Sequence, residues 1–283
     1  MFEKYKARVE SALLQYIDGM GEKSPLRDAC AYSLTNGGKR LRPILVLMIG
    51  EALGKNDVMP AALSVEFFHT ASLIADDLPS MDNDAMRRGV PSLHVAFGET
   101  AAILASYTLM AAGYGGIHEN GRIIGNDKRA MECLKYAVKC AGIQGATQGQ
   151  YDDLFPPDLS LKTIQAIIYK KTVTLFEISF LFGWIFGGGD LSKIPLLKKS
   201  AYHLGMAFQI GDDLEDSLQD AGHIRGLNIA AALGRENAIS HLEQEIASFE
   251  EKLKELSLWS SPFQALVKTL QKPLFVSNFC AVR

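Results

Sequence analysis

Two acid-rich stretches, each at the end of an apolar run, constrain the fold of this chain most. Residues 76–84 read Asp-Asp-Leu-Pro-Ser-Met-Asp-Asn-Asp after the apolar residues 67–75, and residues 212–216 read Asp-Asp-Leu-Glu-Asp after residues 207–211. Aspartates crowded at the end of a buried segment repel one another and lose hydration, so the fold must offset that cost. Carboxylate oxygens are ligands that Mg²⁺ prefers, and the ion keeps part of its water when bound. The two stretches therefore favour a metal site.

The downstream cluster has the spacing of one helix face. Asp212 and Asp216 are four residues apart, and Gln209 lies about one turn earlier on the same face. Asp213 lies one step round the helix from them. We therefore expect these side chains to share one site.

The upstream cluster does not fit a straight helix, because Asp82 is six residues beyond Asp76 and falls well off its face. Pro79 disfavours a helical conformation at Leu78, the residue before it. We therefore expect the helix end to distort and to bring Asp82 back toward Asp76 and Asp77. A solvated acidic helix end is the alternative interpretation of either cluster alone. Two clusters accompanied by basic motifs instead favour a metal-bridged site for a diphosphate.

Composition and charge exclude several classes of function. The chain has 283 residues, 48% of them apolar, which is enough for one large domain, and its net charge is −3. That charge supplies no basic field for nucleic acid, so an anionic substrate has to be held by local cations and metal. The four cysteines form no CxxC pair, which indicates reduced core residues of a cytoplasmic protein. We expect no signal peptide at the start of the chain.

Two apolar segments raise the question of a membrane. Residues 101–117 carry no charge, and residues 178–189 are strongly apolar. Both are shorter than a membrane-spanning helix. A helix that is apolar all round lies inside a large helical core or an oligomer interface. We interpret both segments as core and expect no membrane span.

Apolar residues recur at helical spacing along most of the chain, and no convincing run alternates as a strand does. The expected helices cover residues 2–17, 26–34, 37–53, 59–77, 92–114, 127–148, 159–186, 195–216 and 237–256, with a break at the two glycines after residue 114. No linker or repeat divides the chain. The predicted fold class is all-α, as a single domain over residues 1–283.

Three groups of basic residues accompany the acidic clusters. Residues 37–42 read Gly-Gly-Lys-Arg-Leu-Arg, which combines glycines for close approach with three cations at a helix start, where free N–H groups bind anions. An ordinary basic turn is the alternative. His69 lies seven residues before Asp76 on nearly the same face, although a lone histidine is more often a core residue. Arg87 and Arg88 follow the first acidic cluster and would bind phosphate oxygens or neutralise the aspartates.

Three motifs together give the chain a resemblance to a known family. Residues 37–43, 76–89 and 208–216 resemble the GGKRLRP, DDxxxxD…RRG and FQxxDDxxD motifs of the trans-prenyltransferases, the polyprenyl diphosphate synthase family, in order and in spacing. The chain is similar to the bacterial short-chain members, which make farnesyl or geranylgeranyl diphosphate. The resemblance implies an isoprenoid-synthase-type helical bundle around a deep central cavity, and a homodimer.

The resemblance also implies a role for each matching residue. Three Mg²⁺ ions would bridge the two clusters through an allylic diphosphate, with Asp76, Asp82 and Asp212 as direct ligands and Asp77, Asp213 and Asp216 acting directly or from the next layer. The residues implied on the allylic side are Arg87, Lys171, Thr172 and Gln209. Those implied to hold isopentenyl diphosphate are Lys39, Arg42, His69 and Arg88.

The implied reaction is a head-to-tail condensation. Metal and cations stabilise the departing diphosphate, so the allylic C–O bond ionises and the isopentenyl double bond attacks the cation. A non-catalytic subunit that modulates a partner prenyl synthase is one alternative, although both aspartate clusters are present. A terpene cyclase is the other, but it needs no isopentenyl diphosphate site, so Lys39, Arg42 and His69 argue against it.

The loop after the second cluster departs from the family pattern. Residues 217–228 form a shorter loop without lysine, and Arg225 is its one strong cation, with His223 as a weak one. The resemblance leads us to ask whether Arg225 substitutes for the missing lysine.

Two residues before the first cluster bear on product length. Ser72 lies directly beneath Asp76 on the expected helix, and Ala71 lies on its flank. The resemblance singles out Ala71, because bacterial farnesyl synthases of this motif type usually carry a bulky aromatic there. We therefore expect geranylgeranyl rather than farnesyl diphosphate, unless a neighbouring residue such as Tyr107 or Met110 closes the same space.

Overall fold

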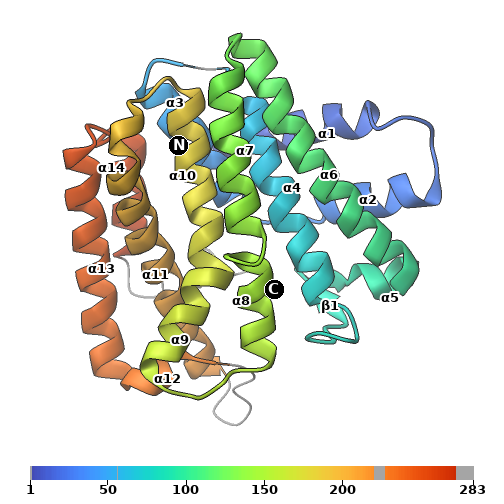
Figure 1. Ribbon diagram of the computed structural model, residues 1–283. Coiled ribbons are helices and arrows are strands. Elements are labelled where there is room, and N and C mark those ends of the chain that lie inside the picture. Colours follow the sequence, from blue (N-terminus) through green and yellow to red (C-terminus); the bar gives the residue numbers. More distant parts are fainter. Residues whose placement is uncertain (1, 56, 220–226, 272–283) are drawn as a thin grey trace. The chain divides into compact units, whose positions relative to one another are not determined.

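The computed structural model describes residues 2–55, 57–219 and 227–271, with the side chains of residues 216–219 left out of that description. These residues form helices joined by short loops, and the strands among them are two residues long (Figure 1). The all-α prediction is therefore confirmed. Within the described residues the chain forms two compact units, residues 2–135 with 182–188 and residues 136–181 with 189–271. The single domain and its deep cavity stay predictions.

The first unit is built around one pair of helices. Its elements are α1 (Phe2–Asp18), α2 (Pro25–Thr35), α3 (Leu41–Ala52), α4 (Met59–Asp76), β1 (Met86–Arg87), β2 (Val90–Pro91), α5 (Leu93–Phe97), α6 (Glu99–Ile124) and most of α7 (Asp127–Ala141). The long helix α6 lies alongside α4, and α3 packs on α4 as well (Figure 1). The helix α4 is buried along most of its length, because apolar side chains cover nearly all of its faces. Its polar end is therefore held by a rigid core.

The expected break after residue 114 is wrong, because α6 continues to Ile124. Gly115 faces open space, but Gly116 and the nearby Gly113 serve close packing between helices. A Cβ at Gly113 would lie 2.4 Å from the ring of Phe68, and a Cβ at Gly116 would lie 2.4 Å from the hydroxyl of Ser64. Both contacts are to α4. The small residues thus let α6 approach α4 and do not end the helix.

The expected helix over residues 127–148 is instead two helices, α7 and α8 (Ala146–Leu154). The chain turns at Gly145, where a Cβ would lie 1.9 Å from the carbonyl oxygen of Cys140. A larger residue could not make this turn without moving the backbone. The break therefore depends on a close backbone contact within the turn, which periodicity does not show.

The second unit packs around α11. Its elements are α8, α9 (Leu161–Ile168), the π-helical turn η1 (Tyr169–Val173), most of α10 (Thr174–Phe186), the short 3₁₀ turn η2 (Leu191–Lys193), α11 (Ile194–Gln219), α12 (Ile229–Leu233), α13 (Arg235–Glu255) and α14 (Ser261–Leu270). The helix α13 runs beside α11 (Figure 1). One core cluster joins α9, η1, α11, α12 and α13, and it contains Ile164, Ile168, Val173, Met206, Ile210, Ile229, Ala230 and Ala238.

The two apolar segments differ in their surroundings. The apolar residues of α10 are buried, which confirms the core interpretation for residues 178–186. One face of α6 is exposed instead, with Ile103, Leu104 and Tyr107 exposed by 38%, 46% and 67%. Core is therefore the wrong interpretation for that face. Within the described part of the chain, no helix combines the length and the apolar character that a membrane span requires.

The cysteines agree with the sequence interpretation where the structure describes them. Cys30, Cys133 and Cys140 are buried free thiols. Burial raises the pKa of Cys30 to about 11 and that of Cys140 to about 12. Cys280 lies outside the described residues.

Candidate active site

The first acidic cluster lies where α4 ends. The helix stops at Asp76, and the amide of Asp82 donates to the carbonyl oxygen of Asp76 at 2.9 Å. The carbonyl of Leu78 accepts from the amides of Met81 and Asn83, which closes the turn. The predicted distortion, with Asp82 brought back beside the helix end, is confirmed.

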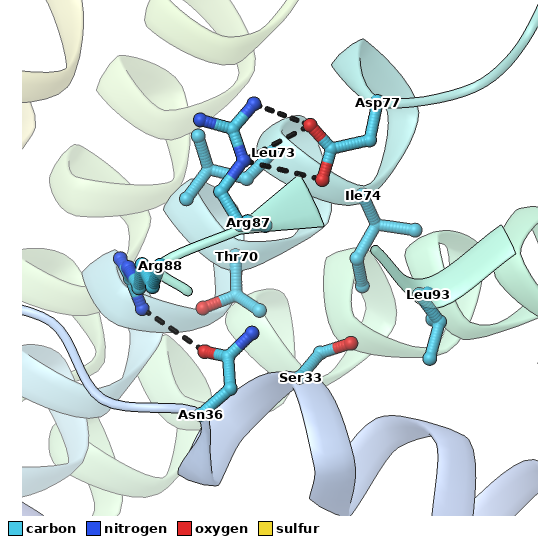
Figure 2. A pocket seen from close by; sticks show the side chains of 9 residues that line it. All are labelled: Ser33, Asn36, Thr70, Leu73, Ile74, Asp77, Arg87, Arg88 and Leu93. Carbon is cyan, nitrogen blue, oxygen red and sulfur yellow. Dashed lines mark hydrogen bonds and ion pairs between the residues drawn. The ribbon is translucent and has the colours of Figure 1, made fainter. Parts of the chain in front are cut away.

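The adjacent aspartates of this cluster have different environments. Asp77 is 3% exposed, and Nε of Arg87 donates to its two carboxylate oxygens at 2.9 and 3.2 Å (Figure 2). Burial raises the pKa of Asp77, and the hydrogen bond from Arg87 opposes that rise. Asp76 and Asp82 are partly exposed. The structure therefore offers Asp76 and Asp82 to a ligand more readily than Asp77.

A tight hairpin turns the two arginines in different directions. The strands β1 and β2 pair antiparallel, with Arg87 opposite Val90, and Arg88 has a φ of 56° in the turn. Arg87 faces Asp77, while Arg88 donates from Nη1 to the carbonyl oxygen of Gly37 at 2.5 Å and to Asn36 Oδ1 at 3.2 Å (Figure 2). The hairpin thus connects the acidic cluster to the glycine-rich loop.

The glycine-rich loop closes directly on Arg88. Gly38 has a φ of 115°, and a Cβ there would lie 2.6 Å from the guanidinium carbon of Arg88. Burial lowers the pKa of Arg88, but an arginine remains charged at neutral pH. Lys39 follows in the same loop and is partly exposed. The motifs at residues 37–42 and 87–89 therefore form one basic surface of the first unit.

The remaining cations of the loop have opposite roles. Arg40 is 4% exposed, forms an ion pair with Glu66 and donates to the carbonyl oxygen of Leu34 at 2.6 Å. Arg40 therefore stabilises the core, and it is the one cation of the motif that the resemblance did not assign to isopentenyl diphosphate. Arg42 is partly exposed, and its Nη1 lies 3.3 Å from Nε2 of His69.

His69 lies close to several guanidinium groups. Burial lowers its pKa well below the ordinary value, and the charges of Arg42 and Arg88 lower it further. The ring is therefore neutral at pH 7, and Nε2 accepts from Arg42. Within the described residues, Nδ1 has no hydrogen-bond partner. His69 thus orients Arg42 without adding a charge.

A small cavity lies beneath these groups. Its volume is about 20 Å³, and its lining includes Asp77, Arg87, Arg88, Asn36 and Thr70 (Figure 2). That volume holds about one water molecule. The cavity is too small for a diphosphate, so it does not serve as the substrate site.

The residues expected to set product length lie one turn below the cluster. Ala71 is buried, and its carbonyl oxygen accepts the hydroxyl of Ser106 from α6 at 3.0 Å. Ser72 donates to the carbonyl oxygen of His69 in its own helix at 2.9 Å. Tyr107 belongs to the exposed face of α6, whereas Ser106 bonds to Ala71.

The second acidic cluster divides in the same way as the first. Asp213 is 5% exposed, and its carboxylate accepts the amide of Ile229 at 2.6 Å and the side-chain amide of Gln209 at 2.9 Å. It therefore holds the start of α12. Asp212 is partly exposed. The side chain of Asp216 lies outside the described residues, and so do Arg225 and His223.

Of the predicted allylic-side residues, Lys171, Thr172 and Gln209 belong to the second unit, whereas Arg87 belongs to the first. Thr172 donates to Oε1 of Gln209 at 2.9 Å. Lys171 Nζ lies 2.6 Å from Asp153, and Lys170 Nζ lies 2.7 Å from Asp152. The sequence interpretation missed both acidic partners. The available signal was the acidic pair after residues 148–151, Gln-Gly-Gln-Tyr, at the end of a polar helix.

The partly exposed carboxylates of the two clusters are ligands of the type that Mg²⁺ prefers. Within the described residues, no three His, Cys, Asp or Glu side chains are already gathered around a metal position. Mg²⁺ is usually bound by one or two carboxylates together with substrate phosphates and water. Asp76 and Asp82 supply partly exposed carboxylates of that kind at the end of α4, and Asp212 supplies one on α11 of the second unit. Each acidic cluster by itself therefore offers the type of ligand that Mg²⁺ takes together with a diphosphate.

Comparisons with known proteins point to one family. The family model described as polyprenyl synthetase matches residues 23–225. The farnesyl diphosphate synthase of Geobacillus stearothermophilus is 40% identical over 220 residues, 75% of this chain and 72% of that protein. Geranylgeranyl pyrophosphate synthase 11 of Arabidopsis thaliana is 37% identical over 240 residues, 80% of this chain and 66% of that protein. The crystal structure of a geranyltransferase from Legionella pneumophila aligns with a TM-score of 0.87 at 27% identity, covering 95% of both chains.

Proposed function

Because the chain belongs to the polyprenyl synthetase family, we propose that it is a short-chain trans-prenyl diphosphate synthase. It condenses isopentenyl diphosphate head-to-tail with an allylic diphosphate. The observation that supports this best is the separation of two kinds of anion site. A cluster of arginines around the glycine-rich loop suits a diphosphate held by cations, while the partly exposed aspartates suit one held through metal.

Isopentenyl diphosphate binds to the basic surface of the first unit. Arg88 is held by the loop carbonyl of Gly37, and Arg42 is held by neutral His69. Both guanidiniums are thus positioned before the ligand arrives, which lowers the entropy lost on binding. Lys39 supplies a further cation from the same loop. The C–O bond of isopentenyl diphosphate does not break in the reaction. Its diphosphate can therefore be held by cations alone, without a metal.

The allylic diphosphate binds with three Mg²⁺ ions. Asp76, Asp82 and Asp212 are direct ligands in this proposal, and Asp77, Asp213 and Asp216 act directly or from the next layer. When bound, the ions neutralise the negative charge that develops on the departing diphosphate. Arg87 and Lys171 add hydrogen bonds to the same oxygens.

The remaining residues position the reactants. Lys171 leaves Asp153 to bind the diphosphate, and the hydrogen bond between Thr172 and Gln209 keeps both side chains on the allylic side. The allylic C–O bond breaks with its electron pair on the diphosphate. The double bond of isopentenyl diphosphate attacks the resulting cation, a C–C bond forms, and a proton is lost to the diphosphate. No side-chain nucleophile takes part.

The product is geranylgeranyl diphosphate. An aromatic residue at position 71 would stop a growing chain that passes the end of α4. The small side chain of Ala71 does not. Tyr107 does not fill the space within one chain, because 67% of its surface is exposed.

The test is incubation with isopentenyl diphosphate, Mg²⁺ and each allylic diphosphate in turn, followed by product sizing. The expected main product is geranylgeranyl diphosphate. Ala71→Tyr is expected to shift the product toward farnesyl diphosphate with limited loss of turnover, and Ala71→Ser is the matched control that leaves the volume nearly unchanged. A wild-type product that is purely farnesyl, or an unchanged product in Ala71→Tyr, would refute the assignment.

The functional form is a homodimer in the cytoplasm. The exposed face of α6, with Ile103, Leu104 and Tyr107, supports self-association, because apolar side chains on one helix face are stabilised when a second copy covers them. Light scattering after size exclusion is expected to give twice the chain mass, and Tyr107→Glu to reduce it. The buried free thiols support a reducing compartment. Cell fractionation would test that placement.

A further inference from the structure

The residues Lys171 and Thr172 lie on a helical turn that is not α-helical. Residues 161–186 run as one helix, but Tyr169–Val173 form the π turn η1. At its end the amide of Thr174 donates to the carbonyl oxygen of Tyr169, five residues earlier. The hydroxyl of Thr174 donates to the carbonyl oxygen of Lys170 at 2.6 Å, which satisfies the acceptor that the amide has left. Such turns are rare and occur mostly at functional sites.

Two neighbouring helices approach the backbone of this turn at glycines. A Cβ at Gly149 of α8 would lie 2.3 Å from the amide nitrogen of Lys171 and 2.6 Å from its Cα. A Cβ at Gly205 of α11 would lie 2.9 Å from Cγ2 of Val173 and 3.1 Å from its Cα. Both α8 and α11 pack on η1. The turn is therefore enclosed at its middle, by Gly149, and at its end, by Gly205, through approaches closer than a Cβ tolerates.

A buried carboxylate connects the turn to the rest of the second unit. Glu177 is 2% exposed, and Oε1 accepts the hydroxyl of Tyr169, the first residue of η1, at 2.8 Å. Its Oε2 lies 2.9 Å from Lys198 Nζ on α11 and 3.8 Å from Cys140 Sγ on α7. Removing one partner of such a pair leaves a poorly solvated charge, so this cluster holds its geometry firmly. Glu177 is one to two turns beyond the lysines and does not itself carry the chemistry.

We propose that Glu177 is a positioning residue that, through Tyr169 and Lys198, fixes the π turn and thereby places Lys171 and Thr172 for the allylic diphosphate. This inference rests on the proposed function for the identity of the ligand. Loss of the Tyr169 contact allows the turn to relax toward an α-helix, which rotates the residues of the turn about the helix axis. Lys171 and Thr172 then point away from their positions beside Asp153 and Gln209.

The test measures binding of two ligands separately by calorimetry with Mg²⁺. The allylic probe is geranyl thiolodiphosphate, in which sulfur replaces the bridging oxygen, and the second ligand is isopentenyl diphosphate. Glu177→Gln is expected to weaken allylic binding about tenfold and to change isopentenyl diphosphate binding less than about twofold, because a small displacement of a positioning group is costly. Tyr169→Phe keeps the ring and loses only the hydroxyl, so it gives a smaller change of the same kind and serves if Glu177→Gln folds poorly.

Two comparisons distinguish positioning from a general loss of structure. In a Lys171→Ala background, Glu177→Gln is expected to have a clearly smaller further effect on allylic binding, because one of the two groups that it positions is gone. Ser179→Ala is the matched control, since Ser179 is a buried polar residue of the same helix. Within the described residues, its hydroxyl donates to the carbonyl oxygen of Leu175 in that helix. It is expected to leave both affinities unchanged.

The inference would be overturned if Glu177→Gln and Tyr169→Phe weakened the binding of both ligands equally. It would also be overturned if Glu177→Gln weakened allylic binding by the same factor in the Lys171→Ala background as in the wild type. Turnover of the wild type is measured in parallel with both natural substrates. If the wild type binds the allylic probe but makes no product, the proposed function fails, and the ratio of affinities still decides the role of Glu177.

Discussion

A single methyl group at Gly38 offers a sharp test of the basic surface. Gly38→Ala places a Cβ 2.6 Å from the guanidinium carbon of Arg88, whereas carbon atoms in contact normally lie about 3.5–4.0 Å apart. The end of a flexible arginine side chain yields more easily than the backbone. The guanidinium is therefore expected to move by about 1 Å, which breaks its hydrogen bond to the carbonyl oxygen of Gly37.

The magnitude follows from that one displaced cation. A hydrogen bond to a charged group contributes about 1.5–3 kcal/mol, so an Arg88 that no longer reaches its ligand weakens binding about 10- to 100-fold. The KM for isopentenyl diphosphate is expected to rise by that factor, and the KM for the allylic substrate by less than about twofold. The φ of 115° at Gly38 adds a stability cost of about 1–3 kcal/mol.

Gly37→Ala provides the matched control. Gly37 also has a positive φ, 90°, but a Cβ there meets nothing within 4 Å. It therefore shares the backbone strain and leaves Arg88 in place. Steady-state kinetics with each substrate varied in turn, together with thermal unfolding of both variants, separates the two effects. Equal KM values for isopentenyl diphosphate in Gly38→Ala and Gly37→Ala would refute the role assigned to Arg88.

Three further predictions concern the charged groups. Asp76→Ala and Asp212→Ala are each expected to nearly abolish turnover at saturating Mg²⁺ with helix content unchanged by circular dichroism; wild-type turnover in either would contradict the two-cluster proposal. Lys39→Ala is expected mainly to raise the KM for isopentenyl diphosphate and Lys171→Ala that for the allylic substrate, and equal effects on both substrates would argue against the two sites. Because burial and nearby arginines lower the pKa of His69, the unfolded chain binds a proton there at a higher pH than the folded chain. The free energy of unfolding should therefore fall as the pH drops below about 6.5, by up to about 1.4 kcal/mol per pH unit, and it should fall less steeply in His69→Gln. The same dependence on pH in the wild type and in His69→Gln would refute this role of His69.

Local chemistry was sufficient to predict the all-helical class and most of the helices, the turn that brings Asp82 back to Asp76, and the motifs that matter. These features depend on neighbours within a few residues. Apolar spacing determines helix faces, and the restriction that Pro79 places on Leu78 ends α4 near the cluster. The family resemblance came from the same short segments.

Which member of each charged group is buried was decided only by the tertiary structure. Adjacent residues on a helix point about 100° apart. One aspartate of each pair therefore turns inward. Helix spacing alone does not say which, because that depends on the helices packed alongside, although the family resemblance favoured Asp76 and Asp212 as the direct ligands. Asp77 is covered through Arg87, and Asp213 through the start of α12. Arg40 turns inward for the same reason and pairs with Glu66.

The close approach of helices was equally beyond the sequence. A glycine within an apolar run is an expected break when only its neighbours are known. Gly116, one of the two glycines of the expected break, keeps α6 against Ser64, and Gly149 and Gly205 enclose the turn that carries Lys171. The missing Cβ is a local property, but its effect depends on atoms that are distant in the chain. The sequence by itself therefore determined which elements form and which chemistry they carry, while contacts between distant segments decided which side chains remain available to a substrate.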